Sequence, residues 1–493
     1  MERKMRFLLI APWGNPPQWR KAKYRVEVKH PALRIEAEDV ENCSSTAALA
    51  KQLGKTGDVD VLIFGMDTAI PPADQELRKA VEEKYREWAD KLDVKADVVS
   101  LPGIGLYHGW HFKATALHIF NKALHAILQK AEKLKPSFIV VDLTHGVNYQ
   151  TVAVLYAAVA ASVLLDLEGR TIIYNSEPYP PNHMSEKCVS GDRQVPDKTE
   201  PPGLAVLDVT ELQSVIRAIR QLSALKSLAP SRIDTPREMP QELCPRFEKV
   251  VTSYMLLASG AAALLFPNAR YVGREPAIYK PGSGSGGLPP PPDEVNRDDE
   301  THTVSYGEAD ASYPIQAALH YLERELDKLK AEDLAAFLNK AAGHYEKAGV
   351  ALVSQVLRTT ADELGLMAKA AEVMADKGVL ERREGAVRLA QREVAALFEN
   401  SKRILEIKDA DALRDAWEDA LREAEALLRS ESRKGISERA LRNLLAHGGF
   451  AYTVVKEVAV RGGKVVEAVY DGEKVAELVE MLKPPRCRET IGD

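Results

Sequence analysis

The chain has 493 residues, which is longer than one hydrophobic core usually supports, so two or three domains are expected. Hydrophobic residues make up 45% and charged residues 28% of the sequence, as in ordinary globular proteins. The formal net charge is only −6, which excludes a broad basic surface for duplex nucleic acid. Any contact with nucleic acid must therefore come from a local groove.

The spacing of the cysteines and the lengths of the apolar runs indicate the cellular compartment of the protein. The chain contains four widely separated cysteines and no CxxC pair: Cys43, Cys188, Cys244 and Cys487. This spacing argues against a zinc ribbon or a disulfide scaffold and fits a reducing compartment. The early apolar run is too short for a signal peptide, and Met255–Phe266 is shorter than the ~20 residues that span a bilayer. We therefore expect a cytoplasmic protein, and the low content of 11 asparagines and 12 glutamines hints at a thermophile.

The first 225 residues alternate between short apolar runs and amphipathic stretches. The apolar runs, expected to be strands, are Met5–Ala11, Val59–Gly65, Val94–Leu101, Ser137–Leu143 and Thr171–Tyr174. Helices are expected within Phe112–Lys133 and Val152–Leu165. β-Branched runs separated by helices are typical of a parallel sheet that is covered on both faces. Residues 1–225 are therefore predicted to form a Rossmann-like α/β domain.

The remainder is predicted to be mostly α-helical. A helical linker region is expected over 226–400, and a C-terminal core over 401–493 that also uses helices from 246–265 and 315–350. Within the linker, the Gly/Ser- and Pro-rich segment at 280–300 is too poor in apolar residues to fold alone, so we expect a disordered insertion. Glycines at 378 and 385 break the helical pattern and suggest a helix-turn-helix-like piece near 377–392. Alternating runs at 453–460 and 464–470 predict a β-hairpin before a last helix.

Two polar segments follow predicted strands of the α/β domain. Gly14 and Asn15 follow the first strand, and a second segment follows the strand that ends near 142: Thr144, His145, Gly146 and Asn148. Ligands of open α/β sheets bind beyond the carboxyl ends of the strands, where small donors and helix N-termini hold anions. Taken singly, Thr144 or Asn148 is more simply a helix cap and Gly146 a turn. Together they predict a binding site for a phosphate or a base.

A second motif lies near the C-terminus, where Arg442, Asn443 and His447 form an R-x4-H pattern followed by two glycines. A histidine transfers protons near neutral pH, and an arginine holds phosphate oxygens. A spacing of five places Arg442 and His447 about 140° apart on a helix, so they do not share a face unless the helix ends at His447. The alternative is a surface pair at the C-terminal end of a helix.

Four histidines, His108, His111, His118 and His125, raise the possibility of a metal site. The last three repeat every seven residues, as on one helix face, but no carboxylate lies among them. We therefore favour an amphipathic helix and expect no metal. No GxGxxG follows the first strand, and no P-loop motif is present, so dinucleotide and P-loop functions are excluded.

These motifs together resemble one family. Asp142–Tyr149 (DLTHGVNY), with Trp13–Pro16 (WGNP) and Tyr174–Glu177 (YNSE), resembles the CARF domain of CRISPR-associated type III accessory ribonucleases. The R-x4-H motif resembles the signature of HEPN ribonucleases, as in the archaeal-type CARF–HEPN group. The resemblance implies a homodimer, or an assembly of dimers, that binds one cyclic oligoadenylate, with cyclic tetra-adenylate as the first expectation. The expected ligand contacts are the residues of the two polar segments: Gly14, Asn15, Thr144, His145, Gly146 and Asn148. Weaker candidates are Ser44, Ser45, Thr46, Asp67 and Thr68.

By the same resemblance, two R-x4-H motifs would meet across the dimer and cut single-stranded RNA without a metal, leaving a 2′,3′-cyclic phosphate. No membrane partner is implied. One alternative is a CARF-type regulator that binds DNA through the helix-turn-helix-like piece. The other is that Thr144 and His145 assist hydrolysis of the cyclic ligand.

Overall fold

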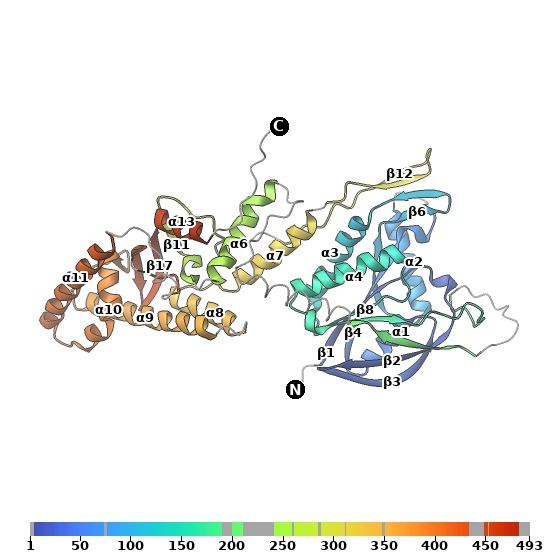
Figure 1. The fold of residues 1–493 in the computed structure, drawn as a ribbon, viewed down its shortest axis with the longest axis horizontal. Helices are drawn as coiled ribbons and strands as arrows, with labels where there is room; N and C mark the ends of the chain where they lie inside the picture. The colour runs from blue at the N-terminus through green and yellow to red at the C-terminus, as the bar shows by residue number, and fades with distance from the viewer. Residues whose placement is uncertain are drawn as a thin grey trace. The chain divides into compact units, whose positions relative to one another are not determined.

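The computed structural model describes residues 4–72, 76–189, 200–210, 241–258, 261–283, 287–310, 312–347, 351–432, 448–451 and 453–482. The chain divides into two compact units, which Figure 1 colours along the sequence. The first unit comprises Met1–Ser231 and Leu288–Pro314, and the second comprises Arg232–Gly287 and Ile315–Asp493. A segment inside the expected linker region therefore belongs to the N-terminal unit.

The first unit is built on an eight-stranded sheet in the order β3-β2-β10-β9-β8-β1-β4-β5. Its strands are β1 (Met5–Pro12), β2 (Ala22–His30), β3 (Leu33–Asn42), β4 (Gly57–Met66), β5 (Ala96–Leu101), β8 (Phe138–Asp142), β9 (Thr171–Ser176) and β10 (Gly203–Asp208). The five strands from β9 to β5 are parallel, with Phe7 of β1 opposite both Val59 of β4 and Phe138 of β8. The predicted parallel α/β domain is thereby confirmed.

Within the described residues, the helices that cover this sheet are α1 (Ser45–Leu53), α2 (Leu77–Lys91), α3 (Ala116–Leu134) and α4 (Asn148–Leu164). Helices α1 and α2 contact β4, whereas α3 and α4 contact each other and β1. Because a crossover between parallel strands is right-handed, the two pairs lie on opposite faces. The central strands are therefore buried on both sides, which explains why Phe7–Ala11 is a continuous apolar run.

The hairpin of β6 (Ile104–Tyr107) and β7 (Trp110–Lys113) corrects the predicted histidine stripe. Its two turn residues, His108 and Gly109, have φ values of 53° and 80°, as in a type I′ turn. His111 therefore lies on a strand, and α3 begins only at Ala116. The sequence pattern missed this because polar turn residues were counted as part of one helix.

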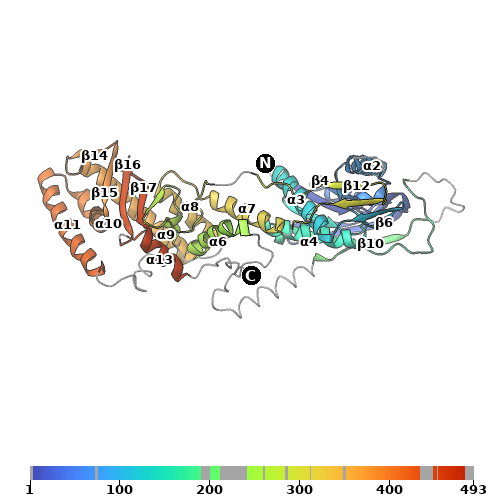
Figure 2. The ribbon, with the colours of Figure 1, turned by 90° about the horizontal axis from the view of Figure 1, so that it is seen from above.

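The segment 288–314 corrects the predicted disordered insertion. It contains β12 (Val295–Asp298) and β13 (Thr303–Tyr306), which form an antiparallel hairpin. Strand β13 pairs in parallel with β7, which gives a four-stranded sheet in the order β12-β13-β7-β6 (Figures 1 and 2). The composition of the segment suggested disorder because its strand partner lies far away in the sequence. The open edge of β7 supplies that partner.

The second unit combines helices with a five-stranded sheet in the order β11-β17-β16-β15-β14 (Figure 2). Its helices within the described residues include α6 (Cys244–Ala258), η5 (Ala262–Leu265), α7 (Tyr313–Asp327), α8 (Leu334–Lys347), α9 (Ala351–Asp376), α10 (Gln391–Glu406), α11 (Ala410–Ser432) and α13 (Gly472–Met481). Its strands are β11 (Ala269–Val272), β14 (Arg382–Arg383), β15 (Ala386–Ala390), β16 (Val455–Arg461) and β17 (Lys464–Asp471). No helix in the described ranges is long and apolar enough to cross a membrane.

The predicted helix-turn-helix-like piece is wrong. After α9, the chain forms the β14–β15 hairpin before α10 begins. Its turn residues Glu384 and Gly385 have φ values of 51° and 74°, which again fits a type I′ turn. The glycine that was interpreted as a turn between helices is therefore a hairpin turn.

Candidate functional site

The strand order of the first unit reverses between β1 and β8, which is where open α/β sheets bind ligands. The two polar segments predicted from the sequence follow these two strands, and the structure brings them together. The amide of Gly14 donates to the carbonyl of His145 at 2.7 Å. A Cβ on Gly14 would lie only 3.1 Å from that carbonyl oxygen, so the close approach favours glycine. We call this end of the sheet the sensing edge, comprising residues 13–16, 43–46, 66–68 and 142–149.

Asp142, the last residue of β8, organises the sensing edge from beneath. Its buried carboxylate accepts hydrogen bonds from the hydroxyls of Ser45 and Thr46, both at 2.7 Å. It also accepts from the amide of Thr144 at 3.1 Å and from the hydroxyl of Thr144 at 2.6 Å. The sequence analysis did not select Asp142. The available signal was a carboxylate that ends an otherwise apolar strand, because such a buried charge needs several donors.

His145 acts as an acceptor within this arrangement. Its Nε2 accepts from the amide of Ser45 at 3.1 Å, and its ring stacks on Trp19 with centroids 4.0 Å apart. Burial lowers the pKa of His145 to about 4, so the ring is neutral at physiological pH. Because Nε2 accepts a hydrogen bond, the proton is assigned to Nδ1. The ring therefore holds α1 against the β8 loop.

Thr144 and Gly146 also have local structural duties. The hydroxyl of Thr144 accepts from the amide of Ser176 at 3.0 Å while donating to Asp142, which ties the β8 loop to β9. A Cβ on Gly146 would lie 2.2 Å from the hydroxyl oxygen of Thr151 and 2.9 Å from Pro12. Gly146 is thus required by close packing rather than by a turn with positive φ. The helix-cap alternative fails for Thr144, because the N-cap position of α4 is Val147.

The side chains of Asn15 and Asn148 have the freedom that the other predicted residues lack. Both are exposed, and neither side chain has a hydrogen bond within the described ranges. Asn148 is the first residue of α4, whose opening amide groups point toward the sensing edge. Nearby, the hydroxyl of Ser44 is buried without a hydrogen-bond partner in the described structure. Of the predicted ligand residues, Asn15 and Asn148 therefore have exposed side chains that remain available for a ligand.

The loop after β4 joins the sensing edge through Tyr85. The hydroxyl of Tyr85 donates to the carbonyl of Gly14 at 2.6 Å and accepts from the amide of Met66 at 3.3 Å. The next residue, Asp67, is fully buried, and burial raises the pKa of its carboxyl group. Asp67 accepts from the hydroxyls of Ser100 and Tyr306. Sequence analysis placed Asp67 among weaker ligand candidates, but its carboxylate is already occupied by protein donors.

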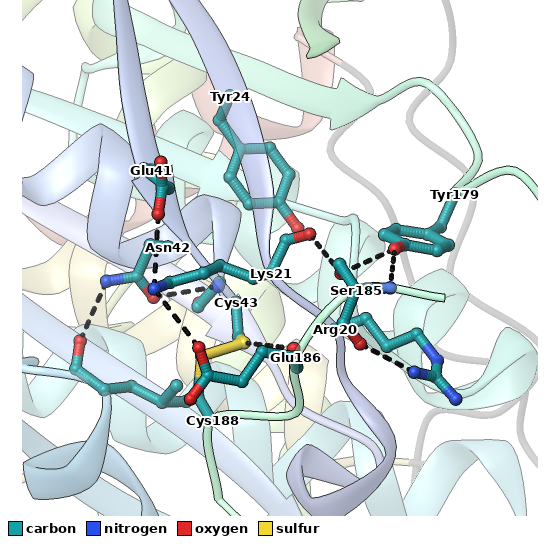
Figure 3. Close-up of a disulfide and its surroundings, with 12 residues drawn as sticks. Arg20, Lys21, Tyr24, Glu41, Asn42, Cys43, Tyr179, Ser185, Glu186 and Cys188 are labelled. Atoms are coloured by element: carbon teal, nitrogen blue, oxygen red, sulfur yellow. Dashed lines mark hydrogen bonds and ion pairs between the residues drawn. A yellow bond between two sulfur atoms is a disulfide. The ribbon is translucent and has the colours of Figure 1, made fainter. Parts of the chain in front are cut away.

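A disulfide next to the sensing edge corrects the expectation from the cysteine spacing (Figure 3). Cys43 and Cys188 are bonded across a sequence separation of 145 residues, with their Cα atoms 6.1 Å apart. Cys244 is also disulfide-bonded. The loop that carries Cys188 is anchored nearby, since the amide of Lys21 donates to the carbonyl of Glu186 at 2.8 Å. Spacing along the chain could not exclude this pair, because folding brings the loop after β9 to the end of β3.

The disulfide between Cys43 and Cys188 removes the argument for a reducing compartment that rested on the spacing of the cysteines. It closes a long loop, and constraint of the unfolded chain is the usual source of stabilisation. It also fixes the residue that immediately precedes Ser44, Ser45 and Thr46. The crosslink therefore contributes to both the stability and the local order of the sensing edge.

Replacing Cys188 with serine is expected to lower the free energy of unfolding by about 2–5 kcal/mol. The change should appear as a lower melting temperature in differential scanning calorimetry. The Cys43→Ser, Cys188→Ser double variant is the control, and it should melt with the single variant because both lose the same crosslink. An unchanged melting temperature in either variant would show that the bond does not stabilise the fold.

The predicted catalytic residues Arg442, Asn443 and His447 lie outside the described residues. Directly after them in the chain, Gly448 and Gly449 both have positive φ, at 59° and 89°. The carbonyl of Gly448 accepts from the amide of Ala263 at 2.7 Å. A Cβ on Gly449 would lie 2.7 Å from the carbonyl of Ala261. The C-terminal side of the motif is therefore anchored to η5 by a contact that only glycine fits.

Comparison with known proteins identifies the first unit. Residues 8–178 match the family described as CRISPR system endoribonuclease Csx1, CARF domain. This part of the chain is therefore similar to the CARF domain of CRISPR-associated endoribonucleases. This confirms the resemblance of the N-terminal motifs to a CARF domain. The matched residues contain all six predicted ligand contacts.

The curated CRISPR system endoribonuclease Csx1 of Methanocaldococcus jannaschii is 26% identical over 186 residues, which cover 36% of this chain and 37% of that protein. The chain thus matches little more than a third of this relative's length. A solved structure, Enterococcus italicus Csm6 bound to cyclic hexa-2′-fluoro-hexa-dAMP, aligns over 98% of this chain and 93% of that chain. Its identity of 11% and TM-score of 0.25 do not establish a common arrangement.

Proposed function

We propose that this chain is a metal-independent endoribonuclease of CRISPR type III defence that is activated by a cyclic oligoadenylate, with cyclic tetra-adenylate as the first ligand to test. The observation that carries the proposal is the CARF match over residues 8–178, a range that contains the sensing edge. A phosphate or an adenine edge would meet the free amides of Asn15 and Asn148 and the N-terminus of α4. The matched relative is itself named as an endoribonuclease.

In this proposal, Arg442 and His447 carry out the chemistry. His447 moves a proton at the 2′-oxygen or the leaving 5′-oxygen of single-stranded RNA, and Arg442 stabilises the charge on the phosphate. Asn443 orients one of them. The products are a 2′,3′-cyclic phosphate and a free 5′-hydroxyl, and no metal takes part. The Gly448–Gly449 turn, which directly follows the motif in the sequence, is anchored to η5.

The proposed dimer is supported by helix α4, which starts at the sensing edge. Val152, Tyr156 and Val163 lie on one side of this helix and are 53%, 64% and 46% exposed. They follow the spacing of one helix face, and the opposite face packs on the sheet. A contiguous exposed apolar face marks a contact with another protein. Pairing of α4 with α4 from a second copy would place two sensing edges close together.

Replacing Tyr156 with glutamate is expected to convert the dimer into monomers at micromolar concentration, because it places a charge within the apolar face. Size-exclusion chromatography with light scattering measures the change. Leu352→Glu is the matched control, since Leu352 is 74% exposed at the start of α9 and lies outside the proposed interface. A dimeric Tyr156→Glu variant would exclude this face as the interface.

Two alternatives are less well supported by the geometry. Hydrolysis of the ligand by Thr144 and His145 would need groups that are free to react. The hydroxyl of Thr144 instead donates to Asp142, and Nε2 of His145 accepts from Ser45. The DNA-binding regulator loses its main argument, since the expected helix-turn-helix-like piece is a β-hairpin.

The proposal is tested by incubating the full chain with labelled single-stranded RNA in EDTA, with and without cyclic tetra-adenylate. Cleavage that requires the ligand and survives EDTA is the expected result. Ligands of other ring sizes are tested in parallel. If no ring stimulates cleavage, the ribonuclease proposal fails, and binding of labelled duplex DNA in the presence of ligand tests the regulator instead.

A further inference from the structure

One segment connects the two units in an unusual way. Residues 288–314, which we call the strap, belong to the first unit, although the residues on either side of them belong to the second. The strap is therefore covalently joined to the second unit at both of its ends, to Gly287 on its N-terminal side and through α7 on its C-terminal side. Any displacement of the strap within the first unit is passed along the chain to both of these points.

Between Asp293 and Asp310, the strap is held to the first unit by hydrogen bonds and a ring contact. Nζ of Lys122 donates to Asp293 at 2.8 Å, Nε2 of His118 contacts the carbonyl of Gly307 at 2.6 Å, and Nδ2 of Asn121 donates to the carbonyl of Asp310 at 2.7 Å. The guanidinium of Arg297 lies 4.7 Å from the ring centre of Trp110. The strap is thus an integral part of the sheet edge rather than a loose linker.

The strap meets the sensing edge at Tyr306. Its partly buried hydroxyl donates to the carboxylate of Asp67 at 2.8 Å and accepts from the amide of Gly103 at 2.9 Å. Asp67 directly follows Met66, whose amide donates to the hydroxyl of Tyr85, and the same hydroxyl donates to Gly14. Three hydrogen bonds and the peptide link between Met66 and Asp67 therefore join Gly14, a predicted ligand residue, to the strap.

Close packing leaves little room for these parts to move separately. A Cβ on Gly65 would lie 2.5 Å from the ring of Tyr85, and a Cβ on Gly103 would lie 2.5 Å from the side chain of Thr68. Breaking the Tyr306 contact would take a donor from a buried carboxylate, which is costly. A shift of the loop after β4 should consequently move the strap with it.

We propose that the hydrogen bond between Tyr306 and Asp67 transmits the structural change caused by ligand binding at the sensing edge to the second unit. Tyr306 is thus a positioning residue, which contacts neither ligand nor RNA. The inference rests on the proposed function, because it requires a ligand that changes the activity of the second unit. Transmission of this kind requires the ligand to favour one arrangement of the β4 loop and strap over another.

The test uses Tyr306→Phe, which removes only the hydroxyl. Cyclic tetra-adenylate should bind the variant with a dissociation constant within about twofold of the wild type, as measured by calorimetry, whereas ligand stimulation of RNA cleavage should fall at least about tenfold. Tyr279→Phe is the matched control, since Tyr279 also donates to an aspartate, Asp327, at 2.9 Å, but within the second unit. It should bind and respond like the wild type.

Hydrogen exchange gives an independent readout that does not depend on RNA cleavage. In the wild type, the ligand should change exchange at both the loop 143–148 and the strap. In Tyr306→Phe the loop should still respond, whereas the strap should not. Normal stimulation and a normal strap response in the variant would overturn the inference alone. A wild type that no cyclic oligoadenylate stimulates would instead overturn the proposed function.

Discussion

Replacing His447 with alanine is expected to abolish RNA cleavage while leaving ligand binding intact. A positioned proton donor or acceptor accelerates such reactions by about 10²–10⁴-fold, so the rate with saturating ligand should fall by at least about 100-fold. The loss should be confined to the chemical step, because the CARF match ends at residue 178 and His447 lies far beyond it. The measurement is the single-turnover cleavage rate of labelled RNA in EDTA.

The matched control for this prediction is His344→Ala. His344 is an exposed histidine on α8 of the same unit, and it should be replaceable without loss of activity. If His447→Ala cleaves at the wild-type rate, the R-x4-H motif is not catalytic, and the surface-pair interpretation of Arg442 and His447 holds instead. Equal loss in both variants would indicate damage to the helical unit.

Replacing Asp142 with alanine is expected to have the second-largest effect, because it removes the acceptor that holds the sensing edge. The hydroxyls of Ser45, Thr46 and Thr144 would lose their common partner. Hydrogen bonds to a charged group contribute about 1.5–3 kcal/mol each, so the free energy of unfolding should fall by at least about 3 kcal/mol. Cyclic oligoadenylate should bind at least tenfold more weakly, as measured by calorimetry and chemical denaturation.

Two further variants make this result specific. Asp142→Asn keeps one acceptor oxygen and should lie between alanine and the wild type in both measurements. Asp58→Ala, the control, removes an exposed carboxylate at the start of β4 that pairs with Lys4. An exposed pair contributes little, so this variant should match the wild type. Full ligand affinity in Asp142→Ala would show that Asp142 does not organise the site.

The sensing edge shows how far residue patterns alone could lead. Gly14, Thr144, His145 and Gly146 were selected because they are polar or small residues at strand ends, and the structure brings them together. The hydrogen-bond partner of each residue could not be predicted, because a hydroxyl or an imidazole can bond equally well to a ligand or to another group of the protein. The sequence shows Asp142 only as the end of a strand, because two of its donors, Ser45 and Thr46, lie nearly 100 residues earlier in the chain.

The sequence by itself determined those features that depend on local periodicity and on motifs, namely the buried strands and the family of the first unit. The apolar runs at Phe7–Ala11 and Phe138–Asp142 specify strands that are buried on both faces, and DLTHGVNY indicates the CARF family. The tertiary structure alone decided the Cys43–Cys188 bond, the strap and the contact between Tyr306 and Asp67. Each of these joins residues more than 140 positions apart, so its energy arises only after the chain has folded, and no local pattern records it.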